Sequence, residues 1–378
     1  MFMKRKVLFL IESFITGGAE RVLLDLANAM DKTKFDVTVL SVFKESVYKG
    51  YDAKFDEDFS PNVHRRYLVD NTVRWKYLLF NYLYNKLPKK WFHKLLVGNG
   101  YDTEVAFYEG LPTVFLSHST NKKSKKIAWL HYGGGFADSK GKKKKQYQKV
   151  YSEYDLIVGV SKGVCDNFIQ KVGLNKNVLV RYNIFDDEKI KMKAGISIRK
   201  SCATTSFIAV GRVCEVKGYD RLLRVCLRLK KDGFVFIVSI IGGKQIREYF
   251  DELKTFIVEN SMGNYVRMLG HKDNPYPYIK ASDWLISSSY TEGYSTVVAE
   301  SMIIGTPVIS TLCSGTKELL GENNEWGICC ENSDDGLYEA MKEVLKKREI
   351  HDYYEGKAIE RGGKFNKKLL VEQLEELF

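Results

Sequence analysis

The sequence has no stretch that approaches the roughly twenty consecutive apolar residues a helix needs to cross a bilayer. Its seven cysteines show neither the spacing of a zinc site nor a regular disulfide framework. The basic and apolar start, MFMKRKVLFLIES, has too short an apolar run and no small-residue cleavage site for a signal peptide. We therefore expect a cytoplasmic protein whose first apolar run is a core strand.

The glycine signature of dinucleotide-binding folds is also incomplete. The apolar strand expected at residues 6–12 ends at Thr16-Gly17-Gly18, and a helix is expected to begin near Ala19. A Gly-Gly turn allows the backbone to approach a ligand closely, but the full G-x-G-x-x-G pattern is absent. This argues against a nicotinamide or flavin enzyme.

The length and the pattern of apolar segments favour an α/β protein with two domains. A chain of 378 residues exceeds the usual size of a single core. Short apolar strands alternate with amphipathic helices in both halves, which predicts two doubly wound, Rossmann-like domains with parallel sheets. A polar, lysine-rich stretch at 182–206 is interpreted as the linker, so we expect domains at 1–182 and 183–363.

The most informative motif is YTEGYSTVVAESMIIGTPV at residues 290–308. An apolar strand is expected just before it, and a helix is expected to begin at Ser295. Glu292 then lies in the loop beyond the strand, and Glu300 lies inside the helix. The free N–H groups of the helix start, between the two carboxylates, suit a diphosphate. A nucleotide sugar has a matching order of ribose, diphosphate and hexose, with hydroxyl groups on either side of the diphosphate. The alternative is that the acidic residues stand at the helix start simply to complement the helix dipole.

A second motif, FIAVGRVCEVKGYDRLL at residues 207–223, supplies positive charge. A short apolar strand leads to Gly211 and Arg212, then to Lys217 and Gly218, then to an amphipathic helix. Such a turn gives close backbone approach and cationic charge to a leaving diphosphate without a metal. The alternative is a solvated basic turn.

These two motifs, together with FITGGAERVLLDLA near the N-terminus, resemble the retaining glycosyltransferases of family four, which have the GT-B fold. The resemblance spans nearly the whole chain, in the expected order. It implies transfer of a hexose, from a UDP-sugar by preference, to a hydroxyl of a saccharide or polyprenyl-linked saccharide, with retention of configuration. Bacterial capsule, lipopolysaccharide or other surface polysaccharide assembly is the implied setting, at the inner face of the plasma membrane.

The resemblance also implies roles for individual residues. Arg212 and Lys217 would neutralise the donor diphosphate, Glu300 would bind the ribose, and Glu292 would hold hydroxyls of the transferred sugar. Ser295 and Ser301 stand where the family more often has Gly and Ala, and neither difference removes a charge. The resemblance also implies that His131 belongs with Arg212, Lys217 and Glu292 among the catalytic residues, in contact with the donor sugar. The remaining implied donor contacts are Gly17, Gly18, Gly211, Gly242, His271, Tyr294, Ser295 and Thr296.

Other implied features concern the domain boundaries. Asn183 and Asp186 resemble the family's entry to the linker, and the amphipathic segment 364–378 would pack back on the first domain.

His131 follows an apolar run and precedes three glycines, and the alternative for it is a hydrogen-bonded structural histidine.

No metal or cofactor is expected. Asp56-Glu57-Asp58 matches the D-x-D pattern by which another glycosyltransferase fold holds a divalent ion, but no apolar strand precedes it. Arg212 and Lys217 already supply the charge compensation. We interpret the acidic loop as solvated surface.

The formal charge of +12 suggests an anionic partner. Basic residues gather at 121–126, at 140–149 and, interleaved with aromatics, at 74–96, which fits a surface that lies on anionic lipid. The alternative is core aromatics beneath a solvated charged face. No recognised nucleic-acid motif is present, so nucleic acid is not expected.

Two other functions remain open from the sequence. A nucleotide-sugar 2-epimerase shares the fold and would convert the donor without an acceptor. A catalytically silent scaffold of this fold need not keep the four charges of Arg212, Lys217, Glu292 and Glu300.

Overall fold

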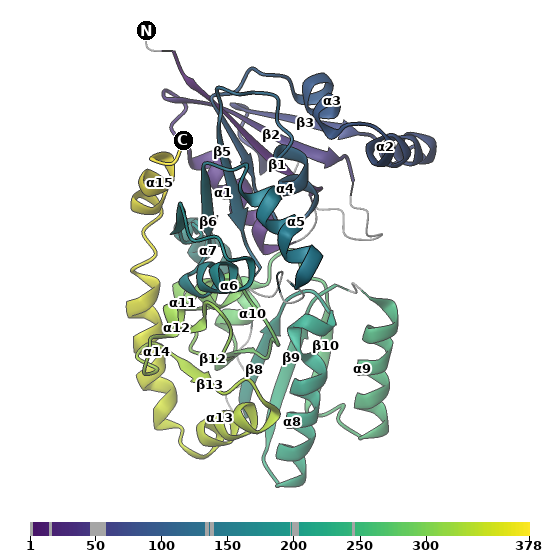
Figure 1. Ribbon diagram of the computed structural model, residues 1–378. Coiled ribbons are helices and arrows are strands. Elements are labelled where there is room, and N and C mark those ends of the chain that lie inside the picture. Colours follow the sequence, from purple (N-terminus) through teal and green to yellow (C-terminus); the bar gives the residue numbers. More distant parts are fainter. Residues whose placement is uncertain are drawn as a thin grey trace. The chain divides into compact units, whose positions relative to one another are not determined.

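The computed structural model describes residues 3–14, 17–45, 58–132, 136, 140–196, 198, 204–243 and 246–378. The chain divides into two compact units, each built on its own parallel sheet (Figure 1). Unit 1 comprises Met1–Ile184 and Lys368–Phe378, and unit 2 comprises Phe185–Lys367. The two sheets agree with the expected α/β class.

Unit 1 has a seven-stranded sheet in the order β3-β2-β1-β4-β5-β6-β7, in which every neighbouring pair is parallel. Its interior strand β1 is apolar and buried from Val7 to Ile11, as expected for a parallel strand covered on both faces. The strands are β1 Arg5–Ile11, β2 Phe35–Phe43, β3 Val63–Val69, β4 Thr103–Ala106, β5 Lys125–Leu130, β6 Leu156–Gly159 and β7 Val178–Val180.

The helices of unit 1 connect these strands and flank the sheet (Figure 1). They include one π-helical segment, η2, which continues directly from α3. The helices are α1 Gly18–Ala29, α2 Arg74–Lys86, α3 Lys89–Phe92, η2 His93–Val97, α4 Leu111–Leu116, α5 Gly141–Tyr151, α6 Lys162–Val172 and the C-terminal α15 Lys367–Glu375.

Unit 2 has a six-stranded parallel sheet in the order β10-β9-β8-β11-β12-β13. Its strands are β8 Thr205–Val210, β9 Phe236–Ile241, β10 Val266–Gly270, β11 Trp284–Ser287, β12 Val308–Thr311 and β13 Ile328–Cys330. Its helical segments are α7 Asp187–Ala194, η3 Glu215–Lys217, α8 Tyr219–Lys231, α9 Arg247–Glu259, α10 Tyr276–Lys280, α11 Thr296–Ile304, α12 Thr316–Leu320, α13 Asp334–Lys346 and α14 Glu349–Gly362.

The lysine-rich stretch interpreted as a linker contains a helix, α7, which packs against α10 and α11. The Asp186 carboxylate caps it by accepting a hydrogen bond from the Lys189 N–H at 3.1 Å. Asp186 also pairs with Lys367 at 2.6 Å. Ile190 and Ala194 are buried. These two apolar residues, which stand between charged residues in the sequence, pack α7 into unit 2.

The C-terminal segment lies on the sheet of unit 1. The Phe378 ring packs edge-on against Phe9 and Phe35, with ring centroids 5.3 and 6.3 Å apart. Lys125 Nζ donates to the Leu377 carbonyl at 2.8 Å, and the Asp31 N–H donates to Glu375 Oε1 at 2.6 Å. Aromatic burial and hydrogen bonds therefore attach this segment to the central strands.

In the described part of the chain, no helix has the length and apolar character to cross a membrane.

Replacing Phe378 tests this attachment. Phe378→Ala removes a buried ring from the core of unit 1, so the free energy of unfolding should fall by about 3 kcal/mol, as measured by urea denaturation. Leu369→Ala, in the preceding helix α15 and about half exposed, should change it by less than about 0.5 kcal/mol. Equal effects of the two substitutions would contradict the packing described.

Candidate active site

The strand order of unit 2 reverses between β8 and β11. From β8 the chain builds outward through β9 to β10, and it then returns to the other side of β8 to form β11, β12 and β13. In open parallel sheets, ligands bind beyond the carboxyl ends of the strands at such a reversal. Both motifs singled out from the sequence lie at the two strands that meet at this point, since one runs from β8 into the loop beyond it and the other begins after β11.

A direct ion pair joins the two motifs. Lys217 Nζ lies 2.5 Å from Glu292 Oε1, and the Ser289 hydroxyl donates to the same oxygen at 2.7 Å. Both charged side chains are mostly buried, with 22% and 18% of their surface exposed. Lys217 has three donors, so the contact with Glu292 leaves two donors for other acceptors. The pair holds a cation and a carboxylate side by side at the reversal point.

The backbone around this pair is closely packed. Gly218 has φ of +63°, and a Cβ there would lie 2.2 Å from the Ser288 carbonyl oxygen. The Ser288 hydroxyl donates to the Lys217 carbonyl at 2.9 Å, and the Tyr290 N–H donates to the Val216 carbonyl at 2.9 Å. Only glycine fits at position 218, because the loop after β8 lies directly against the loop after β11.

The end of β9 is equally restricted. A Cβ on Gly242 would lie 1.9 Å from the carbonyl oxygen of Gly211. That carbonyl also accepts a hydrogen bond from the Tyr219 hydroxyl at 3.1 Å. Arg212 follows Gly211 and is half-buried, and its guanidinium has no hydrogen bond or ion pair with the residues that the structure describes. Arg212 is therefore a second cation, close to Lys217 in the sequence, whose donors are available to a ligand.

Helix α11 begins at the same edge of the sheet. Its first four N–H groups have no partner within the helix, as at any helix start. Ser295 precedes the helix and is 8% exposed, and its hydroxyl oxygen is buried without a hydrogen-bond partner among the described residues. A buried hydroxyl without a partner is costly. The helix start thus offers polar groups that a ligand would satisfy.

Glu300 lies one turn further along α11. Its Oε1 accepts a hydrogen bond from the Tyr276 hydroxyl of α10 at 3.1 Å. The helix start separates Glu300 from Glu292 along the chain, as the sequence predicts. His271 follows the edge strand β10, where its Nε2 lies 3.2 Å from Asp273 Oδ1, and its side chain is about half exposed. His271 is on the same edge of the sheet, but two strands away from β8.

Unit 1 brings its own set of predicted residues to the carboxyl ends of β1 and β5. Gly17 is the N-cap of α1, and Gly18 is its first residue. A Cβ on Gly17 would lie 2.3 Å from Glu20 Oε2. His131 follows β5, and its ring is 4.8 Å from the Phe107 ring and stacks on Tyr108 at 5.8 Å. Burial lowers the pKa of His131 to about 3, so the imidazole is neutral at physiological pH.

Glu109 is a candidate site residue that the sequence did not reveal. It follows β4, and its Oε1 accepts the backbone N–H groups of His131 at 2.9 Å and Tyr132 at 2.8 Å. Burial raises the pKa of Glu109 to about 7, and the two N–H donors act in the opposite direction. Its Oε2 and the His131 Nε2 are both buried without a hydrogen-bond partner in the part of the chain described. An acidic residue directly after the apolar run VAFY at 105–108 was the available signal.

The D-x-D pattern falls mostly outside the described residues, since Asp56 and Glu57 are not described. Asp58 is described, and its carboxylate lies 3.8 Å from Arg21 Nη1 of α1. Among the described residues, the one cluster with metal-ligand geometry is His351, Asp352 and Glu355, which lies on the surface of α14 away from the reversal point.

Two family models match the chain in succession. The model described as Glycosyltransferase Family 4 matches residues 16–189, and the model described as Glycosyl transferases group 1 matches residues 200–361. They correspond closely to the two units, and together they cover both sets of site residues.

Curated relatives match parts of the chain. An N-acetylgalactosaminyltransferase of Campylobacter jejuni, named for a diphospho-undecaprenol-linked acceptor, is 30% identical over 58% of this chain and 58% of its own length. An uncharacterised glycosyltransferase of Haemophilus influenzae is 24% identical over 88% of this chain and 87% of its own. A lipopolysaccharide core biosynthesis glycosyltransferase of Rhizobium meliloti is 24% identical over 50% and 54%. This chain thus spans little more than half of the first and third relatives.

Solved structures match the whole chain in fold. An Anabaena protein, HepE, in complex with UDP and glucose has a TM-score of 0.74 at 17% identity, over 98% of both chains. A sucrose-phosphate synthase of Thermosynechococcus elongatus has a TM-score of 0.76 at 16% identity, over 99% of this chain and 98% of the other. At these identities the likeness establishes the two-domain architecture.

The buried Glu109 carboxyl predicts a pH-dependent stability. Its pKa of about 7 exceeds the ordinary value of 4.5, so the folded chain binds this proton more tightly than the unfolded chain. The stability that Glu109 contributes should therefore fall as the pH rises from about 4.5 to 7, by at most about 1.4 kcal/mol per pH unit. Urea denaturation of the wild type and of Glu109→Gln across this range measures the difference.

The comparison with Glu109→Gln removes the effect of the neighbouring histidine. His131 contributes a slope of opposite sign between about pH 3 and 6.5, because its folded pKa is lowered, but it is present in both proteins. If the two stability curves stay parallel over the whole range, Glu109 does not hold a proton as described.

Proposed function

Because the chain belongs to the group 1 glycosyl transferases of the GT-B fold, we propose that it transfers a hexose from a nucleotide-diphosphate sugar to a hydroxyl of a saccharide or lipid-linked saccharide. The observation that carries this proposal is the joining of Lys217 and Glu292 beside the start of α11, at the strand reversal of unit 2. Cationic, anionic and N–H groups there match the parts of such a donor.

The donor diphosphate would bind at the start of α11. Free N–H groups and the helix dipole favour an anion there, and the partnerless Ser295 hydroxyl adds a hydrogen-bonding group. Arg212 and Lys217 would neutralise the charge that develops as the diphosphate leaves. Tyr294 and Thr296 flank Ser295 and would contribute backbone contacts.

The two carboxylates would bind hydroxyls on either side of the diphosphate. Glu300, hydrogen-bonded to Tyr276 at 3.1 Å, would hold the ribose. Glu292 would hold hydroxyls of the transferred sugar. We assign Glu292 no nucleophilic role, because its Oε1 already accepts from Lys217 and Ser289 and an ion-paired carboxylate is a weak nucleophile.

Transfer with retention would then proceed on one face of the sugar. The bond between the anomeric carbon and the diphosphate oxygen breaks, and the acceptor oxygen forms the new bond on the same face. The acceptor proton passes to the leaving diphosphate oxygen. His131, Gly17 and Gly18 of unit 1 remain proposed donor contacts, with the imidazole of His131 neutral.

The donor and acceptor classes draw support from the relatives. We favour a UDP-sugar because a solved neighbour carries UDP and glucose. We favour a saccharide on a polyprenyl diphosphate carrier because the Campylobacter jejuni relative is named for one, in the setting of bacterial surface polysaccharide assembly.

Donor binding is the first test. A thermal-shift screen against UDP, GDP, ADP, CMP and their sugar conjugates, with and without magnesium, should show stabilisation by UDP-sugars that does not depend on the metal. A donor at 100 times its dissociation constant adds about 2.7 kcal/mol of stability. No shift with any nucleotide would favour a silent scaffold, and conversion of the donor without an acceptor would favour a 2-epimerase.

Lys217→Ala tests the role of the cation. The variant should lose transfer activity by roughly a hundredfold or more, since a donor aimed at the leaving charge is removed, while its circular dichroism stays unchanged. Lys231→Ala, which changes an exposed lysine at the end of α8, is the matched control and should keep full activity.

A double variant separates two causes of that loss. If Lys217→Ala fails only because it leaves the Glu292 carboxylate unpaired, then Lys217→Ala/Glu292→Ala should recover the binding of UDP, which carries no transferred sugar for Glu292 to hold, as measured by thermal shift. We expect no recovery. Full activity in Lys217→Ala would remove the proposed role at the diphosphate.

A further inference from the structure

Helix α2 presents two different apolar faces. One face is buried, where Phe80 packs edge-on against Phe43 and Phe92 at 5.8 Å and Tyr84 stacks on Phe115 at 6.0 Å. The other face forms a stripe at i, i+3, i+4 and i+7 that is open to solvent. Its members, with their exposed fractions, are Trp75 (61%), Leu78 (55%), Leu79 (46%) and Tyr82 (62%).

The segment that follows extends this apolar surface and surrounds it with positive charge. Trp91 of α3 is 57% exposed, and Leu95 of η2 is 80% exposed. Residues 74–97 contain six basic side chains and no acidic one. The basic residues are Arg74, Lys76, Lys86, Lys89, Lys90 and Lys94.

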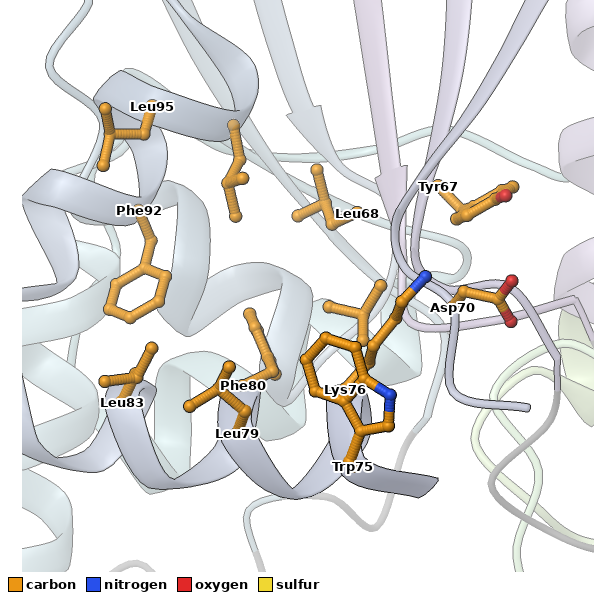
Figure 2. A pocket seen from close by; sticks show the side chains of 12 residues that line it. Tyr67, Leu68, Asp70, Trp75, Lys76, Leu79, Phe80, Leu83, Phe92 and Leu95 are labelled. Carbon is orange, nitrogen blue, oxygen red and sulfur yellow. The ribbon is translucent and has the colours of Figure 1, made fainter. Parts of the chain in front are cut away.

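A pocket of about 410 Å³ lies beside the stripe (Figure 2). Leu79 and Leu83 of α2, Leu68 of the edge strand β3, and Phe92 and Leu95 line it, and their side chains point into it in Figure 2. Its volume is within the range of small-molecule sites. The pocket can take a hydrocarbon chain, because its lining is mainly apolar.

One carboxylate lies at the pocket, that of Asp70. It accepts a hydrogen bond from the Thr72 hydroxyl at 2.5 Å and lies 3.4 Å from Lys44 Nζ. The charge of Asp70 is therefore compensated within unit 1, and the surface remains positive.

The lysine run of α5 differs from this surface. Lys142, Lys143 and Lys145 are exposed and Lys144 is half-buried, but the ring of Tyr151 at the end of α5 packs into the core against Phe136 and Phe168 at 5.8 and 4.9 Å. That run offers charge without an exposed apolar anchor. The α2–η2 surface, defined as residues 74–97 with the pocket beside it, combines both.

We propose that the α2–η2 surface docks unit 1 on an anionic membrane, with the exposed stripe inserted among the lipid chains and one chain in the pocket. The basic side chains would lie at the level of the lipid phosphates, where aromatic and basic residues together stabilise interfacial binding. The charge of this segment favours anionic lipid over a second copy of the same basic surface. The inference deepens the proposed function and rests on it only for the lipid-linked acceptor.

Vesicle co-sedimentation of the full chain tests this docking surface, without donor or acceptor. The probe is phosphatidylglycerol mixed with phosphatidylcholine, compared with phosphatidylcholine alone. Trp75→Ser/Leu79→Ser/Leu95→Ser removes apolar anchors without changing the charge and should lower binding to the anionic vesicles about tenfold or more. The matched control is Met192→Ser/Val235→Ser/Val258→Ser in unit 2, where the three side chains are 70%, 69% and 76% exposed, and it should bind as the wild type does.

A charge variant tests the basic groups separately. Lys76→Gln/Lys90→Gln/Lys94→Gln should weaken binding to anionic vesicles and reduce its dependence on salt, because fewer charges face the lipid phosphates. Equal binding of the wild type to both kinds of vesicle would overturn the electrostatic part of the proposal.

Three further results bear directly on the docking surface. Unchanged vesicle binding by the apolar triple variant would overturn the proposal, as would a wild type that binds no vesicles. A wild-type dimer in light scattering that this variant converts to a monomer would show that a second copy covers the surface. A thermal shift with UDP, measured on the same variants, keeps failure here separate from failure of the proposed transferase activity.

Discussion

The ion pair between Lys217 and Glu292 is the interaction on which the organisation of unit 2's site depends. It joins the loops after β8 and β11, and the backbone beneath it leaves room only for glycine at position 218. Because the strands on either side are parallel neighbours, the same contact places a cation, a carboxylate and the start of α11 at one edge of the sheet. Unit 1 shows a corresponding arrangement, in which Glu109 holds the backbone that follows β5.

The sequence predicted the two parallel sheets and most of the residues at their carboxyl ends. These features depend on short apolar runs and on residue types directly beyond them, which are local. The contact between Lys217 and Glu292 could not be predicted, because 75 residues separate the partners and strand order decides their distance. Glu109 was missed for the same reason, since its carboxylate accepts hydrogen bonds from two N–H groups on a neighbouring loop.

The remaining differences concern which apolar residues face the core. The aromatic and basic segment at 74–96 had two interpretations, core aromatics or a surface that lies on anionic lipid, and the structure buries some of its aromatics and exposes others. Phe80, Tyr84 and Phe92 are buried, whereas Trp75 and Trp91 are exposed. Spacing alone could not separate these sets, because α2 has apolar residues on both of its faces. Likewise, α7 was interpreted as a linker because its charges outnumber the two buried residues of its inner face.

Residues at the carboxyl edge of unit 2's sheet differ in how freely they can be substituted. At Gly242 any side chain would collide with the Gly211 carbonyl, so no single substitution is tolerated without moving the loop. Ser295, in contrast, has a hydroxyl with no partner among the described residues, and its removal would break no described hydrogen bond. Variation can therefore be accommodated at the Ser295 side chain while the backbone beneath it stays fixed. New ligand preferences can arise there by the exchange of one side chain.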